Sequence, residues 1–305
     1  MHKQANLVKA GARAAGRNKR YVVCFYLLNL LFAWWGTAAF SSHAHGILDH
    51  SLYADKLLHG FDLAALVELI ARPEFGPVQS STRPAMLWGI LFFLTSLVFM
   101  PGVLLGYSSD HRISREEFFR ACGHNVWRFV RLFVIYAVFA AILCGILFGI
   151  QDALVKAVDR TANDDRLPFV TQMLSMTLIF LVLTVIRIWF DLAQTHVVLR
   201  DQKAVRKSLG WGLRAMRRGF GRLLGTYVAV AIIGLIILAA GILLWHAIVP
   251  PSSVLGAFIV SQALLLLLLG LRFWQRASVV AFYVRQAAEP EREVQAPVMA
   301  VPMAT

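Results

Sequence analysis

Long apolar stretches separated by shorter polar segments dominate the hydrophobic pattern of the chain. Six of them reach the roughly 20 apolar residues that a helix needs to cross a hydrocarbon core. They lie at about 21–41, 86–107, 129–150, 169–190, 223–248 and 254–275. The pattern predicts an all-α polytopic membrane protein with six transmembrane helices.

The composition agrees with this prediction. Of 305 residues, 58% are hydrophobic and only 15% are charged, with a mean hydropathy of +0.64, whereas soluble domains are nearer half apolar and a quarter charged. The first apolar run could also belong to a signal peptide, but its length and the far-end Trp34–Trp35 pair favour an uncleaved span. We expect residues 1–285 to form one membrane domain, and residues 286–305 to form a disordered cytoplasmic tail.

The net charge of +13 is distributed unevenly along the chain. The alternate loops 43–85 and 151–168 hold six Lys and Arg against nine Asp and Glu, and the other polar segments hold the remaining 24 basic residues. Cytoplasmic loops carry such a basic excess, so both termini are predicted to be cytoplasmic. The excess can bind anionic lipid headgroups, and no nucleic-acid partner is expected because no nucleic-acid-binding motif accompanies it.

Three basic segments precede the spans that leave the cytoplasm, and they resemble one another. Each has an arginine at the membrane boundary (Arg20, Arg131 or Arg222), with an aromatic residue five positions later. Small and apolar residues at helical spacing, with basic residues between them, predict helices that lie along the headgroups. The six spans are therefore predicted as three hairpin repeats, each preceded by a basic cytoplasmic surface helix.

The stretch RIWFDLAQTHVVLR, which follows span four, carries charge at the end of an apolar run. Arg187 and Asp191 are one helical turn apart there, and the Arg-x-Trp element recurs 85 residues later with Arg276 in place of the aspartate. The eighteen residues from Phe169 cover about 27 Å, so Arg187 is expected near the inner interface. A boundary anchor is favoured, although charge inside a bilayer is also a functional-site candidate.

The sequence thus offers two sets of candidate residues at the inner interface. The candidate polar cluster is Arg187, Asp191, Arg272 and Arg276. The interface anchors are Arg20, Arg131, Arg222, Trp189 and Trp274. Basic and tryptophan side chains are the usual anchors at this depth.

Three further features have a functional and a structural interpretation. Pro101–Gly102 is expected to kink or unwind span two, and broken helices can mark transport sites. A ridge of small residues on span three allows close approach of a membrane partner or a second copy; it consists of Ala137, Ala141, Gly145 and Gly149. Weak metal candidates in the first outer loop are His43, His45, His50 and Asp49, although periodic apolar residues favour surface helices there.

The segment FDLAQTHVVLRDQKAVRKSLGWGLRAMRRGFGRLLGTYV and the external LDHSLYADKLLHGFD carry a resemblance. They resemble uncharacterised bacterial six-span membrane proteins, which are similar in layout to the membrane domain fused to some glycerophosphodiester phosphodiesterases. The resemblance implies a bacterial cytoplasmic-membrane location. It implies no catalytic residue, because the phosphodiesterase chemistry belongs to a soluble domain with no counterpart in these residues.

The sequence carries no Walker loop, zinc-protease motif, nucleophile elbow or paired-acid signature. No cofactor is expected, and the sequence is more typical of a non-enzymatic protein than of an enzyme. The favoured function is a structural, assembly or envelope-homeostasis role in the membrane. The alternative is a small transporter or lipid-handling protein with a polar pocket on the cytoplasmic side between repeat units.

Overall fold

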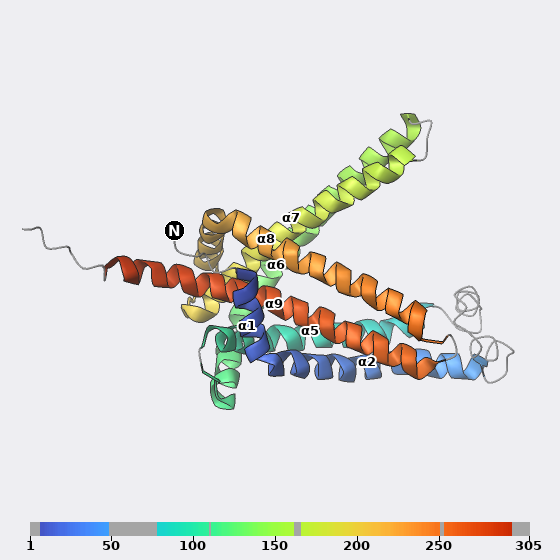
Figure 1. Ribbon diagram of the computed structural model, residues 1–305, viewed down its shortest axis with the longest axis horizontal. Helices are drawn as coiled ribbons and strands as arrows, with labels where there is room; N and C mark the ends of the chain where they lie inside the picture. The colour runs from blue at the N-terminus through green and yellow to red at the C-terminus, as the bar shows by residue number, and fades with distance from the viewer. Residues whose placement is uncertain (1–6, 49–77, 110, 162–165, 251–252, 295–305) are drawn as a thin grey trace, which may run out of the picture. The chain divides into compact units, whose positions relative to one another are not determined.

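The computed structural model describes residues 7–48, 78–109, 111–161, 166–250 and 253–294, and every regular element in these ranges is an α-helix (Figure 1). The helices are α1 (Leu7–Arg17), α2 (Lys19–Leu48), α5 (Val78–Ser108), α6 (Arg115–Thr161), α7 (Arg166–Leu199), α8 (Val205–Ile248) and α9 (Val254–Val294). Six of them, all but α1, are long and apolar enough to cross a membrane. The predicted all-α protein with six candidate spans is confirmed to this extent.

Most helices extend beyond the predicted spans. α6 has 47 residues, so its basic segment continues into the span instead of forming a separate helix. α8 has 44 residues, but it consists of two helices that meet at a kink. α8 is kinked at Gly219, whose φ of −119° and ψ of 21° are not helical. α9 reaches Val294, and it therefore includes the start of the predicted tail, where alanine, glutamate and arginine favour a helix.

The chain divides into two compact units. Unit 1 contains residues 1–15, 101–228 and 274–305, and unit 2 contains residues 16–100 and 229–273. We call the helix ends that carry the basic segments the basic ends; these are the starts of α2, α6 and α8 and the ends of α5, α7 and α9. Unit 1 includes α1 up to Ala15 and most of these basic ends.

Unit 1 has a closely packed core at the basic ends of three helices, joined by α1. Its buried cluster is Leu7, Ile188, Leu192, Ala215, Met216, Leu223, Tyr227, Val279 and Phe282. These residues come from α1, α7, α8 and α9. The pairs Ile188–Leu192, Leu223–Tyr227 and Val279–Phe282 are three or four residues apart, which places each pair on one face of its helix. The basic segments thus bury an apolar face within the protein.

Two junctions in unit 1 have the same construction. The Trp189 indole N–H on α7 donates a 2.9 Å hydrogen bond to the Leu209 carbonyl on α8, and the Trp274 indole N–H on α9 donates one of 2.8 Å to the Val8 carbonyl on α1. Three residues after each acceptor, a glycine allows the two helices to approach closely.

The glycines of these junctions are Gly212 on α8 and Gly11 on α1. A Cβ on Gly212 would lie 3.2 Å from the Ala193 nitrogen, and one on Gly11 would lie 2.9 Å from the Cα of Ser278. Ala193 and Ser278 each follow the junction tryptophan by four residues. Tryptophan, acceptor and glycine are therefore arranged alike in the α7–α8 and α9–α1 junctions.

The junction between α5 and α6 differs, because its glycine lies on α5, the helix that ends there. A Cβ on Gly102 would lie 2.6 Å from the Phe118 ring and 2.8 Å from the Cys122 Sγ. α5 is helical at Pro101 and Gly102 and on both sides of them, and the kink expected there stays a prediction. Gly102 provides the close approach of α5 and α6.

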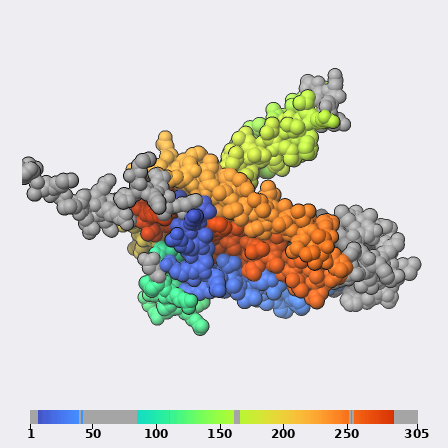
Figure 2. Space-filling view, viewed as in Figure 1, coloured from blue at the N-terminus to red at the C-terminus, as the bar shows by residue number. Residues whose placement is uncertain are grey.

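The remainder of unit 1 is a hairpin of α6 and α7, which run side by side (Figure 1) and form one yellow-green rod in the space-filling view (Figure 2). Exposed apolar residues of this hairpin include Val138, Ile142, Ile146, Phe169, Leu174 and Leu178. An apolar exterior of this kind is expected where helices face lipid. Of the small-residue ridge, Ala137 is half-buried, and Ala141, Gly145 and Gly149 are exposed.

Unit 2 is joined largely by aromatic contacts. Trp88 on α5 lies against Phe32 and Trp35 on α2, with ring centroids 5.8 and 6.0 Å apart. The Tyr26 hydroxyl on α2 donates a 3.1 Å hydrogen bond to Oε1 of Gln262 on α9. A hydrogen bond between membrane helices typically stabilises their association by less than about 2 kcal/mol.

Candidate functional site

Among the described acidic residues of unit 1, Asp191 is the most deeply buried, with only 7% of the residue exposed. The Tyr227 hydroxyl on α8 donates a 2.6 Å hydrogen bond to its Oδ2. Arg187 Nε lies 3.7 Å from the same oxygen, and the Arg187 guanidinium stands 5.7 Å from the centroid of the Tyr227 ring. The three side chains form a compact group that we call the Asp191 centre.

Local sequence explains how the helices position this centre. Arg187 and Asp191 are four residues apart on α7 and therefore share a face. Tyr227 lies on the α8 face that also presents Leu223 to the buried cluster. Gln275 on α9 donates a 3.4 Å hydrogen bond to the Tyr227 carbonyl, so α7, α8 and α9 all contribute to holding the tyrosine.

The other two residues of the candidate polar cluster lie on α9. Arg276 is half-buried in unit 1, and the Asp191 carboxylate attracts its guanidinium. Arg272 belongs to unit 2 and lines a cavity there. Arg276 is thus a second arginine of unit 1 whose charge acts on the Asp191 centre, and the four-residue cluster remains a prediction.

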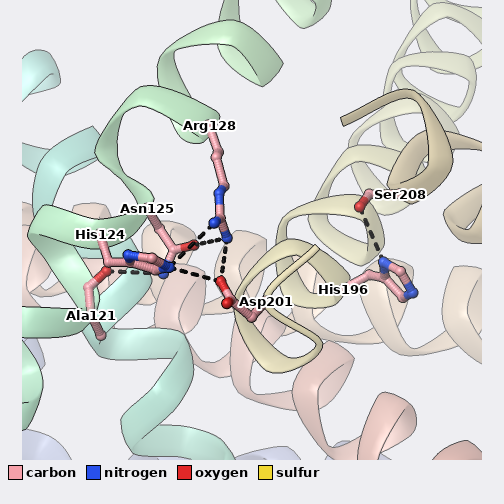
Figure 3. A network of polar contacts seen from close by, with 7 residues as sticks. All are labelled: Ala121, His124, Asn125, Arg128, His196, Asp201 and Ser208. Carbon is pink, nitrogen blue, oxygen red and sulfur yellow. Dashed lines mark hydrogen bonds and ion pairs between the residues drawn. The ribbon is translucent and has the colours of Figure 1, made fainter. Parts of the chain in front are cut away.

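A second polar network lies at the turn between α7 and α8 (Figure 3). Arg128 donates hydrogen bonds to Asp201 Oδ1 and, at 3.1 Å, to Asn125 Oδ1. The His124 Nε2 lies 2.9 Å from the same oxygen of Asp201, and the Asn125 amide donates to the Ala121 carbonyl at 3.0 Å. The turn is thereby tied to α6.

Asp201 also terminates α7 through its backbone. Its φ is 48°, and the Gln202 amide donates a 3.2 Å hydrogen bond to the Val197 carbonyl. This left-handed residue followed by a six-to-one hydrogen bond is the Schellman motif, and aspartate tolerates the conformation better than most residues. The sequence alone does not reveal this role of Asp201, because its partners lie 73 and 77 residues away.

The Asp201 network predicts a stability that depends on pH. Hydrogen bonds from Arg128 and His124 hold the pKa of Asp201 below its usual value. With a lowered folded-state pKa, the stabilisation is fully present above the unfolded-state pKa of about 3.9 and is lost as pH falls through the folded-state value. We expect the unfolding temperature of wild type to be higher than that of Asp201→Asn at neutral pH. The difference between the two temperatures should shrink below about pH 4.

Asparagine suits this comparison because it also adopts the left-handed conformation. The substitution therefore removes the charge and leaves the end of α7 intact. A difference in unfolding temperature that stays constant from neutral to acidic pH would contradict the ionic origin of the stabilisation.

An aromatic group surrounds His196 next to this turn. The imidazole stacks on Trp211 with centroids 4.6 Å apart, and Trp211 meets Tyr283 at 4.8 Å. The His196 Nδ1 lies 3.1 Å from the Ser208 hydroxyl (Figure 3). The histidine therefore joins α7 to the start of α8, and Tyr283 adds α9 to the same packed group.

The predicted interface anchors have local partners in the structure. Arg20 lies over the Tyr21 ring at 4.9 Å, and Arg131 lies over the Trp127 ring at 5.5 Å. Arg222 is exposed. Trp189 and Trp274 form the two helix junctions described above, so their indoles are engaged by protein backbone.

The metal candidates are mostly beyond the described part of the chain. His50 and Asp49 lie outside the described residues, as do the side chains of His43 and His45, although α2 itself continues to Leu48. Within the described residues, no group of three His, Cys, Asp or Glu side chains could share a metal ion. Metal binding by the outer loop stays a prediction.

The six long apolar helices and their apolar exteriors define a polytopic membrane protein. The chain matches no protein-family model, no curated protein and no solved structure in the three comparisons. The resemblance to bacterial six-span membrane proteins therefore remains a prediction from sequence.

Proposed function

We propose that this chain is a non-enzymatic integral membrane protein of a bacterial cytoplasmic membrane, with a structural, assembly or envelope-homeostasis role. Its basic segments hold the packed basic ends against anionic headgroups, with both termini in the cytoplasm. The observation that carries this proposal is that α1 is amphipathic: it packs one face against the protein and exposes basic residues on the other.

α1 buries one face and exposes the other. Leu7 and Gly11 are buried, whereas Lys9, Arg13 and Arg17 are exposed. Residues at four-residue spacing share a helix face, so the three basic side chains form a stripe, which we call the α1 basic stripe. Each basic residue near an anionic membrane surface contributes about 1 kcal/mol of attraction.

The Asp191 centre supports a structural role. Its carboxylate already has a hydroxyl donor and an arginine from within the chain. Removing one partner from a buried ionic group is costly, and such a group therefore favours one arrangement of α7 and α8. A permanent joint between helices fits a scaffold in the membrane.

The proposal is tested by neutralising the α1 basic stripe with Lys9→Gln, Arg13→Gln and Arg17→Gln. The full chain is reconstituted in nanodiscs that contain phosphatidylglycerol and phosphatidylcholine, and bound lipid is measured by native mass spectrometry. We expect the preference for phosphatidylglycerol to fall by at least about tenfold, because three attractions of about 1 kcal/mol are lost.

The matched control neutralises Lys156, Arg160 and Arg166, which lie at the opposite end of the α6–α7 hairpin. This triple variant removes the same charge and is expected to keep the wild-type lipid preference. Equal losses in both triple variants, or no loss in the α1 variant, would contradict lipid attachment through α1.

A small transporter or lipid-handling protein is the second candidate function. The observation that favours it is the excess of cations around Asp191, since Arg187 and the half-buried Arg276 both act on one carboxylate. An anionic substrate could supply the second counter-charge. The test measures flux into proteoliposomes that contain a pH-sensitive dye. If the protein is a transporter, Asp191→Asn should lose the flux of wild type while the variant stays folded. If wild type shows no flux and the variant has a folding defect, the structural role is supported.

A further inference from the structure

Unit 2 contains a partly open cavity of about 710 Å³ lined by α2, α5, α8 and α9. This volume lies within the usual range for ligand sites. α9 supplies one continuous face of it, which runs from Val260 and Ser261 through Leu264, Leu265 and Leu268 to Arg272. The lining is mostly apolar with a cation at one end.

The cavity opens on the apolar exterior of the unit. Its lining residues Ile242, Trp245 and Leu265 are all exposed on the surface. An apolar surface on a membrane-spanning helix faces lipid, so a molecule can enter this cavity sideways from the bilayer. This access from the bilayer requires no water-filled route.

Arg272 gives the cavity its chemical selectivity. Among the residues that the structure describes, it has no hydrogen-bond or ion-pair partner. Asn29 on α2 lines the same cavity and likewise has no partner within the described part of the chain. A guanidinium binds phosphate oxygens in a bidentate manner, so Arg272 can bind a phosphate at this end of the cavity.

The length of the cavity matches one leaflet. From Val260 to Arg272, α9 rises about 18 Å, close to half of the roughly 30 Å hydrocarbon core. From Val254, the start of α9, to Arg272 the rise is about 27 Å, which places Arg272 at the membrane interface of the basic ends. An amphiphile with its head at Arg272 would extend its tail along the leucines.

We propose that this cavity binds an anionic phospholipid from the leaflet of the basic ends. The phosphate lies on Arg272, and one acyl chain lies along the α9 face from Leu268 to Val260. Charge selects the head and apolar lining accommodates the chain. The inference does not depend on the structural role proposed above, because it concerns residues distinct from the α1 basic stripe.

The test uses the full chain in detergent, with phosphatidylglycerol titrated in and bound lipid counted by native mass spectrometry. Two variants address the two halves of the site: Arg272→Gln removes the charge, and Leu265→Trp fills the apolar part. We expect each to weaken phosphatidylglycerol binding by about tenfold or more, since each removes a principal contact. Phosphatidylcholine, which has no net charge, should bind more weakly to wild type than phosphatidylglycerol does.

Matched controls separate the cavity from general effects. Leu267→Trp makes the same substitution on an exposed part of α9 outside the cavity, and Arg160→Gln removes an exposed arginine at the far end of α6, away from the basic ends. Both should bind phosphatidylglycerol as wild type does. Equal binding by all four variants would overturn the proposal, as would equal weakening in all four.

A phospholipid with a photoreactive group in one acyl chain locates the bound chain directly. Crosslinks in wild type are expected at the α9 face between Val260 and Leu268, and they should disappear in Leu265→Trp. Crosslinks spread evenly around α9 would contradict the site. Displacement of phosphatidylglycerol by equimolar palmitate would show that a fatty acid is the ligand and would overturn the phospholipid assignment.

Discussion

Replacing Asp191 with alanine is expected to destabilise the protein by about 3 kcal/mol. The substitution leaves the buried Tyr227 hydroxyl without its acceptor and removes the counter-charge of Arg187. The value lies at the low end for a broken buried pair, because the Arg187 side chain is 37% exposed and can turn towards water. Thermal unfolding in detergent, followed by circular dichroism, measures the effect.

Tyr227→Phe tests the same centre from the other helix. It removes one hydrogen bond to a charged group and should cost about 2 kcal/mol. The double variant should cost less than the sum of the two single variants, because both remove the same interaction. Additive losses would show that Asp191 and Tyr227 stabilise the helices independently.

The control for Asp191 is Asp152→Ala on α6. Asp152 accepts a 2.7 Å hydrogen bond from Lys156, and both side chains are largely exposed. Exposed ion pairs of this kind contribute at most about 1 kcal/mol. Similar losses in Asp191→Ala and Asp152→Ala would contradict the buried joint described here.

Gly11→Ala is expected to displace α1 from α9. The new methyl group would overlap the Ser278 side chain and lie 2.9 Å from its Cα, which cannot rotate away. Overpacking of this kind costs about 1–3 kcal/mol. Limited trypsin digestion at Lys9 and Arg13 should become faster, and the unfolding temperature should fall.

Gly16→Ala is the matched control on the same helix. A Cβ at Gly16 meets nothing within 4 Å, and alanine favours a helix over glycine by up to about 1 kcal/mol. The two identical substitutions should therefore have opposite signs. If Gly11→Ala left both the digestion rate and the unfolding temperature unchanged, close packing of α1 on α9 would be wrong.

The six candidate spans were predictable because each depends only on a local run of apolar residues. The helix boundaries were harder to predict, because a basic segment without a helix breaker can continue the helix of a span, as in α6. The kink at Gly219 had a signal in the glycine-rich RRGFGRLLG, but its position depends on the Phe282 ring, which would overlap a Cβ there. That contact comes from another helix.

The candidate site was predictable only in part. Arg187 and Asp191 are visible as a pair because they share one turn of α7. Tyr227 was noted as the aromatic residue after Arg222, but its hydrogen bond to Asp191 spans 36 residues and depends on how α7 and α8 cross. Tertiary partners of this kind leave no periodic trace in a single sequence.

The two tryptophan junctions also set an order of assembly. Trp189 and Leu209 are 20 residues apart, whereas Trp274 and Val8 are 266 residues apart. A contact between near neighbours can form soon after synthesis, while a distant one waits for its partner. The α7–α8 junction can thus close while the chain is still growing. α1, the first of the described helices to leave the ribosome, docks only after Trp274 has been made, and it is among the last to reach its place.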